Sequence, residues 1–255
     1  MPGSFFLSNN KIVRSFSFKG ANFKIISSAF NIIKDEIVAQ RTLLSNYIIK
    51  HKEFVESLVP LKEIDADAPD IARRMHKASL LTGVGPMASV AGVTAQLAAE
   101  AAVAAGADEA VIENGGDIYI FSKNETKIAL YARKTAIASN LAILIKPETT
   151  PISICSSSSK MGHSLSLGDC DLATITATDG ALADSAATLA GNLVKEEKDI
   201  PAALEKVISI KGVQGVLIVK NDKIGIAGNF PEIVKNIDPM TKDKITKDKA
   251  SLENL

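Results

Sequence analysis

A run of small and apolar residues, MASVAGVTAQLAAEAAVAA at positions 87–105, constrains the fold of this chain more than any other segment. Its alanines favour a helix, and Gly106, which follows directly, is typical of a helix C-terminus. Because short apolar side chains cover almost every face, such a helix is stable only where other elements pack closely around it. The segment therefore predicts a buried helix that lies against a sheet.

Strand-like and helix-like segments alternate irregularly around this helix. Apolar and polar residues alternate at 11–18 and 23–28, whereas 29–58 has apolar residues at helical spacing and predicts one long helix or two broken ones. Further strands are expected at 110–113, 118–121, 127–131, 141–145, 152–155, 172–178, 213–219 and 223–227, and further helices at 69–81, 180–194 and 201–208. This order lacks a regular βαβ repeat and predicts an α+β (mixed α/β) fold, with mixed or antiparallel sheets packed against helices.

Length and composition describe a globular chain without a strong charge preference. The 255 residues suffice for one domain, or one domain of two closely packed lobes, which we expect over 1–235 before a charged, disordered tail at 236–255. The charges of the 29 basic and 29 acidic residues cancel, so the net charge does not indicate binding to nucleic acid. Cys155 and Cys170 fit neither a disulfide framework nor a zinc motif, and we expect buried free thiols.

The first residues and the apolar runs of the sequence indicate the cellular compartment in which the protein is expected. No apolar run is expected to reach the length of about 18–20 residues that a membrane span needs. The first ten residues lack the charged start and long apolar core of a signal peptide. A cytoplasmic location is therefore expected, with a small molecule as the partner.

Two glycine-containing turns offer places where the backbone can approach a ligand. Residues 83–88 match the glycine-to-alanine spacing of a dinucleotide fingerprint, but a helix precedes them where that motif requires a strand. What remains is Gly85 at the start of a helix, whose free N–H groups can receive an anion.

The second turn has the sequence Asn114, Gly115, Gly116 and Asp117, and it lies between two expected strands. A Gly-Gly pair makes a good hairpin turn, because both central positions can take positive φ. Alternatively, the absent Cβ atoms admit a ligand between the neighbouring amide and carboxylate groups. The residues alone favour neither interpretation.

Two further segments carry polar groups that suit phosphates or metal ions. Gly162, His163 and Ser164 follow a run of serines, and this loop offers hydroxyls and an imidazole to phosphates; it lacks the second glycine of a G-x-S-x-G hydrolase motif. Asp184 and Thr188 are four residues apart and share one face of an expected helix, as hard oxygen ligands for Mg²⁺. From spacing alone, a simple role for Asp184 in complementing the helix dipole is favoured.

In this order the segments resemble the ApbE-like superfamily, whose best-known members are FAD-dependent, Mg²⁺-assisted FMN transferases. The blocks that carry the resemblance are VGPMASVAG at 84–92, VIENGGDIYI at 111–120, and GHSLSLG with ATITATDGALADSAATLAGN within 162–192. The likeness is closest to an uncharacterised-protein branch of the superfamily. It covers roughly the stretch from 84 to 192, and no single block carries it alone.

The resemblance implies a function for the polar segments. It implies that this chain binds FAD or FMN with Mg²⁺, and that the flavin nucleotide contacts the glycine turn, namely Gly115, Gly116 and Asp117. It also implies that Gly162 and His163 border the nucleotide, and that Asp184 and Thr188 are metal ligands. Gly85, Asn114 and Ser164 adjoin these groups and complete the expected binding site.

The sequence departs from the transferases in two places. They carry a Gly-Gly-Ile-Ala-Lys-Gly stretch with an Asp soon after it; here residues 85–90 read GPMASV, and Thr94 stands in place of the Asp. The histidine block is shortened to residues 163–168. Two alternatives to FMN transfer therefore stay open: a non-catalytic module that binds a nucleotide or another metabolite, and an assembly protein, such as a homodimer, that pairs through its alanine-rich helix.

Overall fold

Two antiparallel sheets and a layer of helices make up the fold in a computed structural model, which describes residues 3–7, 11–131, 141–158 and 168–235. The strands are β1 (Gly3–Leu7), β2 (Arg14–Phe18), β3 (Ala21–Ile26), β4 (Glu109–Asn114), β5 (Asp117–Ser122), β6 (Thr126–Tyr131), β7 (Leu141–Ile145), β8 (Ile152–Ser157), β9 (Leu172–Ala177), β10 (Val213–Lys220), β11 (Lys223–Gly228) and β12 (Glu232–Lys235). The helices are α1 (Phe30–Lys50), α2 (Lys52–Glu56), α3 (Asp70–Thr82), α4 (Val90–Ala104), α5 (Gly180–Leu193) and α6 (Ile200–Ile208), with a 3₁₀ turn η1 (Pro86–Ser89) before α4. The tail expected at 236–255 lies outside the described residues.

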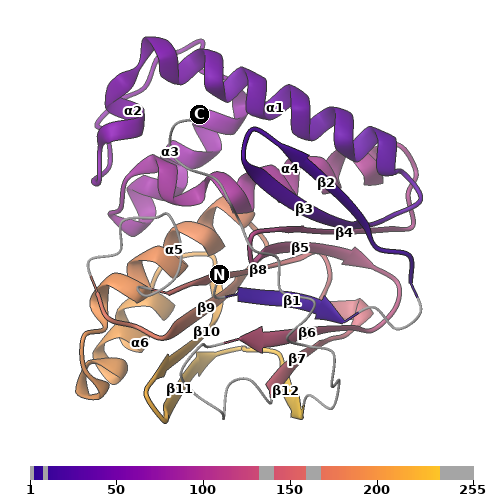
Figure 1. The fold of residues 1–255 in the computed structure, drawn as a ribbon. Coiled ribbons are helices and arrows are strands. Elements are labelled where there is room, and N and C mark those ends of the chain that lie inside the picture. The colour runs from indigo at the N-terminus through magenta and orange to yellow at the C-terminus, as the bar shows by residue number, and fades with distance from the viewer. Residues whose placement is uncertain (1–2, 8–10, 132–140, 159–167, 236–255) are drawn as a thin grey trace.

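The large sheet lies between the helices and the small sheet (Figure 1), and apolar side chains pack on both of its faces. Its strands run in the order β11-β10-β9-β8-β5-β4-β3-β2, and the small sheet is ordered β1-β6-β7-β12. Along β5 the side chains alternate, as a strand requires: Ile118 and Ile120 pack towards the small sheet, and Tyr119 packs under the helices. The predicted α+β class is confirmed, and the described strand pairs within both sheets are antiparallel.

The alanine-rich helix is buried, as its composition predicts. Ala95, Ala98, Ala99 and Ala102 of α4 are fully inaccessible and pack against the large sheet. The regular helix starts at Val90 rather than at residue 87, since η1 comes first and the hydroxyl of its last residue donates back to the carbonyl of Pro86.

One expectation about this segment was wrong. By length and composition, Pro86–Ala104 does qualify as a stretch that could cross a membrane. Over its most apolar window, 56% is buried inside the protein, where α4 contacts α1, α5 and the large sheet. The same composition is therefore used here for close helix packing.

The element boundaries can be compared with the sequence-based expectation. Residues 29–58 form two helices, the second of the two expected alternatives: α1 ends at Lys50 and α2 begins at Lys52. The edge strands β1 and β12 were not expected; each is short, and each pairs with a strand distant in sequence. The remaining strands and helices agree with the expected ranges to within a few residues.

Helices α4 and α5 meet at two glycines. A Cβ added to Gly92 would lie 2.2 Å from the carbonyl oxygen of Gly180, and one added to Gly180 would lie 2.5 Å from the carbonyl oxygen of Gly92. Since real Cβ atoms do not approach backbone this closely, the two helices can touch at this depth only if both positions lack a side chain.

We expect Gly92→Ala to lower the free energy of unfolding by about 1–3 kcal/mol, because the added methyl group forces the two helices apart. Chemical denaturation followed by circular dichroism measures the change. Ala104→Val, at an exposed position near the end of the same helix, serves as the control and should change stability by less than about 0.5 kcal/mol. Equal stability of Gly92→Ala and the wild type would contradict the close contact.

Candidate functional site

The glycine turn between β4 and β5 is a tight hairpin turn. Gly115 and Gly116 have φ of 65° and 111°, so both occupy the region that residues with a side chain rarely adopt. The turn places Asn114 directly opposite Asp117, and both side chains are buried. The Asn114 amide donates to the carbonyl of Ala91 at 3.3 Å, which ties the turn to the start of α4.

Asp184 extends from α5 to the N-terminus of α4. Its Oδ2 accepts hydrogen bonds from the backbone N–H groups of Ala91 at 3.1 Å and Gly92 at 2.9 Å. These are first-turn N–H groups that have no partner within their own helix. The helix N-terminus that was expected to receive an anion therefore already holds a carboxylate of the chain itself. Both bonds use Oδ2, and neither uses the second oxygen, Oδ1.

Asp117 is the second carboxylate at this place. Its Oδ1 accepts the backbone N–H of Ser156 at 3.2 Å, and the side chain of Cys155 also interacts with this carboxylate. Burial raises the pKa of Asp117 to about 7, although both of these interactions act in the opposite direction. The carboxyl group is therefore held where ionisation is costly.

The two carboxylates and the thiol interact electrostatically. Burial, followed by the negative charge of Asp117, raises the pKa of Asp184 well above its usual value, against the two backbone N–H groups that lower it. Burial and then both carboxylates raise the pKa of the Cys155 thiol. The predicted free, buried state of this cysteine is confirmed, and the same holds for Cys170.

The donor set fits a hard divalent cation that takes part of its coordination from a ligand. Two neighbouring carboxylates that oppose each other's ionisation are stabilised by a shared positive charge. Thr188, also buried, lies one helical turn after Asp184 on α5. Within the described ranges, no three His, Cys, Asp or Glu side chains come together in a set that could hold a metal ion. Mg²⁺ suits such a site, because it commonly uses one or two carboxylates together with water and phosphate oxygens.

The other sequence-predicted residues are placed less directly. A Cβ on Gly85 would lie 1.9 Å from the carbonyl oxygen of Ser57, so close packing against the end of α2 already requires a glycine there. Thr94, at the position of the transferase Asp, is fully buried and donates to the carbonyl of Val90 within its own helix. Gly162, His163 and Ser164 lie outside the described residues.

Sequence reasoning missed two partners of Asp117, namely Cys155 and Ser156. They reach it because β8 pairs with β5, and Ile118 lies opposite Ile154 in that pairing. The cysteine was interpreted only as a buried thiol, and no local pattern indicates which strand lies beside β5. The contribution of the Ala91 and Gly92 backbone was missed for the same reason, since it depends on where α5 packs.

Comparisons with known proteins agree with this architecture. Residues 27–210 match the family model described as "AbpE bacteria". A UPF0280 protein of Methanothrix thermoacetophila is 41% identical over 202 residues, which cover 79% of this chain and 84% of that protein. A UPF0280 protein of Archaeoglobus fulgidus is 38% identical over 205 residues, with 77% and 82% covered.

Solved structures with the same fold include flavin transferases. The flavin transferase ApbE from Vibrio cholerae has a TM-score of 0.54 at 12% identity, covering 86% of this chain and 96% of that one. The ApbE protein from Thermotoga maritima has a TM-score of 0.51 at 12% identity, with 85% and 96% covered. At such low identity the likeness establishes the fold alone.

We expect Asp117→Asn to stabilise the metal-free protein at pH 8 and to have little effect near pH 4. Between the ordinary pKa of 3.8 and the folded value of about 7, the folded wild type binds more protons than the unfolded chain. Wild-type stability therefore falls as the pH rises through this window, whereas the amide does not ionise and still accepts from Ser156. The gain at pH 8 is expected to be on the order of a few kcal/mol.

Urea unfolding at several pH values in the presence of EDTA measures this difference. Asp222→Asn, in the exposed turn between β10 and β11, is the control and should give no pH-dependent gain. A gain of Asp117→Asn that is the same at pH 4 and pH 8 would show that ionisation of Asp117 is not the cause.

Proposed function

This chain belongs to the family described as AbpE bacteria, an ApbE-like family with UPF0280 relatives, and from this premise we propose that it binds a flavin nucleotide together with Mg²⁺. The observation that carries the proposal is the pair of interacting carboxylates, Asp117 and Asp184, beside the glycine turn. Two neighbouring acids make each other's ionisation less favourable, which destabilises the folded protein when both are ionised. A bound cation offsets this repulsion.

Each part of the site has a distinct role in the proposal. Asp184 and Thr188 would hold Mg²⁺, and Oδ1 of Asp184 is not used by the two bonds that cap α4. Gly115 and Gly116 let the backbone approach the nucleotide, since no Cβ atom stands in the way. When bound, Mg²⁺ would neutralise charge on the phosphates of FAD or FMN.

The remaining predicted residues border the same nucleotide in this proposal. Asn114 and Asp117 present polar groups at the base of the turn, and both are fixed by hydrogen bonds to neighbouring backbone. Gly85 directly precedes the 3₁₀ turn η1 that leads into α4, and Gly162, His163 and Ser164 follow β8 in the sequence.

FMN transfer and nucleotide binding without turnover are the two finer forms of this function. Transfer is supported by the likeness of the fold to flavin transferases, such as the one from Vibrio cholerae. Binding without turnover is supported by Thr94, which is buried and whose hydroxyl donates to a carbonyl within α4. The side-chain chemistry favours the binding form.

For the binding form, we expect FAD, FMN or ADP to bind the wild type in the presence of Mg²⁺ and to bind at least tenfold more weakly with EDTA. Asp184→Asn should lose this Mg²⁺ dependence, because an amide oxygen still caps α4 but carries no charge. Isothermal titration calorimetry with each nucleotide measures both effects.

The matched control for that titration is Asp179→Asn. Asp179 caps α5 by accepting the N–H of Leu182 at 3.0 Å, and asparagine caps helices equally well. This variant removes one negative charge from the same helix without touching the two carboxylates. Absence of binding by the wild type to all three nucleotides, with or without Mg²⁺, would refute the proposed function.

For the transfer form, incubation with FAD, Mg²⁺ and a panel of acceptor proteins tests for covalently attached FMN by mass spectrometry. We expect FAD to remain intact, because the hydroxyl of Thr94 is used inside its helix. Covalent FMN on any acceptor, with loss of the product in Asp184→Asn, would instead establish transfer.

A further inference from the structure

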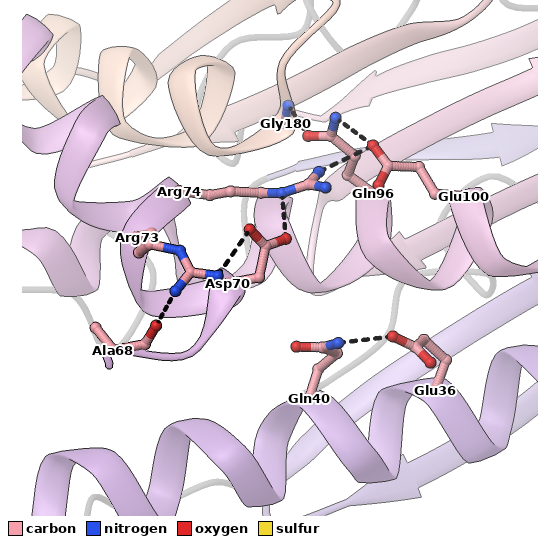
Figure 2. A network of polar contacts seen from close by, with 9 residues as sticks. All are labelled: Glu36, Gln40, Ala68, Asp70, Arg73, Arg74, Gln96, Glu100 and Gly180. Carbon is pink, nitrogen blue, oxygen red and sulfur yellow. Dashed lines mark hydrogen bonds and ion pairs between the residues drawn. The ribbon is translucent and has the colours of Figure 1, made fainter. Parts of the chain in front are cut away.

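Gln96 is a buried amide that bonds a residue of its own helix at one end and another helix at the other. It lies on α4, one turn after Gly92, and only 8% of the residue is exposed. Its Oε1 accepts the backbone N–H of Gly180 at 2.7 Å, and its Nε2 donates to Glu100 at 2.8 Å (Figure 2). Burying an amide is unfavourable unless both ends are bonded, and here both are.

The orientation of this amide is fixed by its neighbours. Glu100 offers only acceptor oxygens, and the N–H of Gly180 offers only a donor, so only one of the two amide orientations satisfies both partners. Arg74 of α3 donates to the same Glu100 oxygen at 2.9 Å and to Asp70 at 2.8 Å. The chain of contacts therefore runs from the exposed side of α3 through α4 to the first residue of α5 (Figure 2).

The bond from Gln96 adds a directional contact to the glycine crossing. Gly92 and Gly180 let the backbones of α4 and α5 touch, and the Cβ atoms of Asp184 and Gln96 lie beside the two glycines. Gly180 is the first residue of α5, and its N–H has no partner within that helix. A directional hydrogen bond to this group fixes where α5 begins relative to α4.

The two helices thus cap each other. Gln96 of α4 binds the first N–H of α5, and Asp184 of α5 binds the N–H groups of Ala91 and Gly92 in the first turn of α4. Asp184 lies four residues after Gly180, about 6 Å further along the helix. A shift of α5 that broke the bond to Gln96 would move this carboxylate as well.

We propose that Gln96 is a positioning residue for the metal-binding carboxylate: through Gly180 it sets α5 so that Asp184 faces Asp117. This inference rests on the proposed binding of Mg²⁺ and a flavin nucleotide. It assigns no ligand contact to Gln96, which acts only through the backbone of α5.

Titration of MgCl₂ into the protein with FAD present tests the proposal. Gln96→Met keeps the length and helix propensity of the side chain but removes both hydrogen bonds, and we expect Mg²⁺ to bind about 10- to 100-fold more weakly, as is typical when a group that orients a metal ligand is removed. Thr94→Val is the matched control: it removes a buried hydroxyl bond of 2.7 Å from the same helix without touching α5. It should bind Mg²⁺ within about threefold of the wild type at comparable thermal stability.

A double variant that exchanges the side chains of Gln96 and Glu100 distinguishes a positioning role of Gln96 from a general effect on packing. Gln96→Glu alone places two carboxylates against each other and should weaken Mg²⁺ binding. In the double variant with Glu100→Gln, the new glutamine donates to the new glutamate and still accepts from Arg74. The new glutamate still accepts the N–H of Gly180, so the affinity for Mg²⁺ should return to within about threefold of the wild type. This comparison also decides the question if Gln96→Met does not fold.

Each result has a definite meaning. Wild-type affinity in Gln96→Met, or failure of the double variant to recover affinity that Gln96→Glu loses, overturns the positioning role while leaving the proposed function intact. Absence of Mg²⁺ and FAD binding in the wild type overturns the proposed function itself, and the role of Gln96 with it.

Discussion

The close contact between α4 and α5 at Gly92 and Gly180 is the constraint on which the arrangement of the candidate site depends. It brings the first turn of α4 within hydrogen-bonding distance of a side chain on α5, so that Asp184 can occupy the helix N-terminus. The same depth of packing lets the amide of Asn114 reach the backbone of α4 from the hairpin turn. A bulkier residue at either glycine would separate all three elements, since core packing transmits such a displacement.

Local patterns in the sequence predicted the elements well but not their neighbours. The alanine-rich run predicted a buried helix, because composition determines this feature locally. A hairpin turn was one of the two open interpretations of the Gly-Gly pair, and both residues do take positive φ. The partners of Asp117 were not foreseen, since they depend on which strand pairs with β5. The edge strands β1 and β12 were not predicted for the same reason: short strands are defined by their pairing rather than by their own residues.

The site combines favourable packing with unfavourable electrostatics. Around Asp117 and Asp184 the described core is apolar and closely packed, and this low-polarity environment makes both carboxyl groups costly to ionise. The hydrogen bonds to these groups, from Ser156, Ala91 and Gly92, fix their directions but do not remove the cost. Such a local conflict within an otherwise consistent fold is characteristic of positions kept for binding rather than for stability.

In the proposed site, Asp184 would also determine how an anionic ligand approaches the N-terminus of α4. In many nucleotide sites the free N–H groups of a helix N-terminus attract phosphate directly, but here a carboxylate already satisfies those groups on α4. A phosphate arriving alone would find these N–H groups already bonded, whereas a divalent cation would supply positive charge to hold it. In the proposed site, the fraction of protein with ligand bound would therefore depend on the product of the nucleotide and Mg²⁺ concentrations. High occupancy would require both ligands together, and neither one alone would be sufficient.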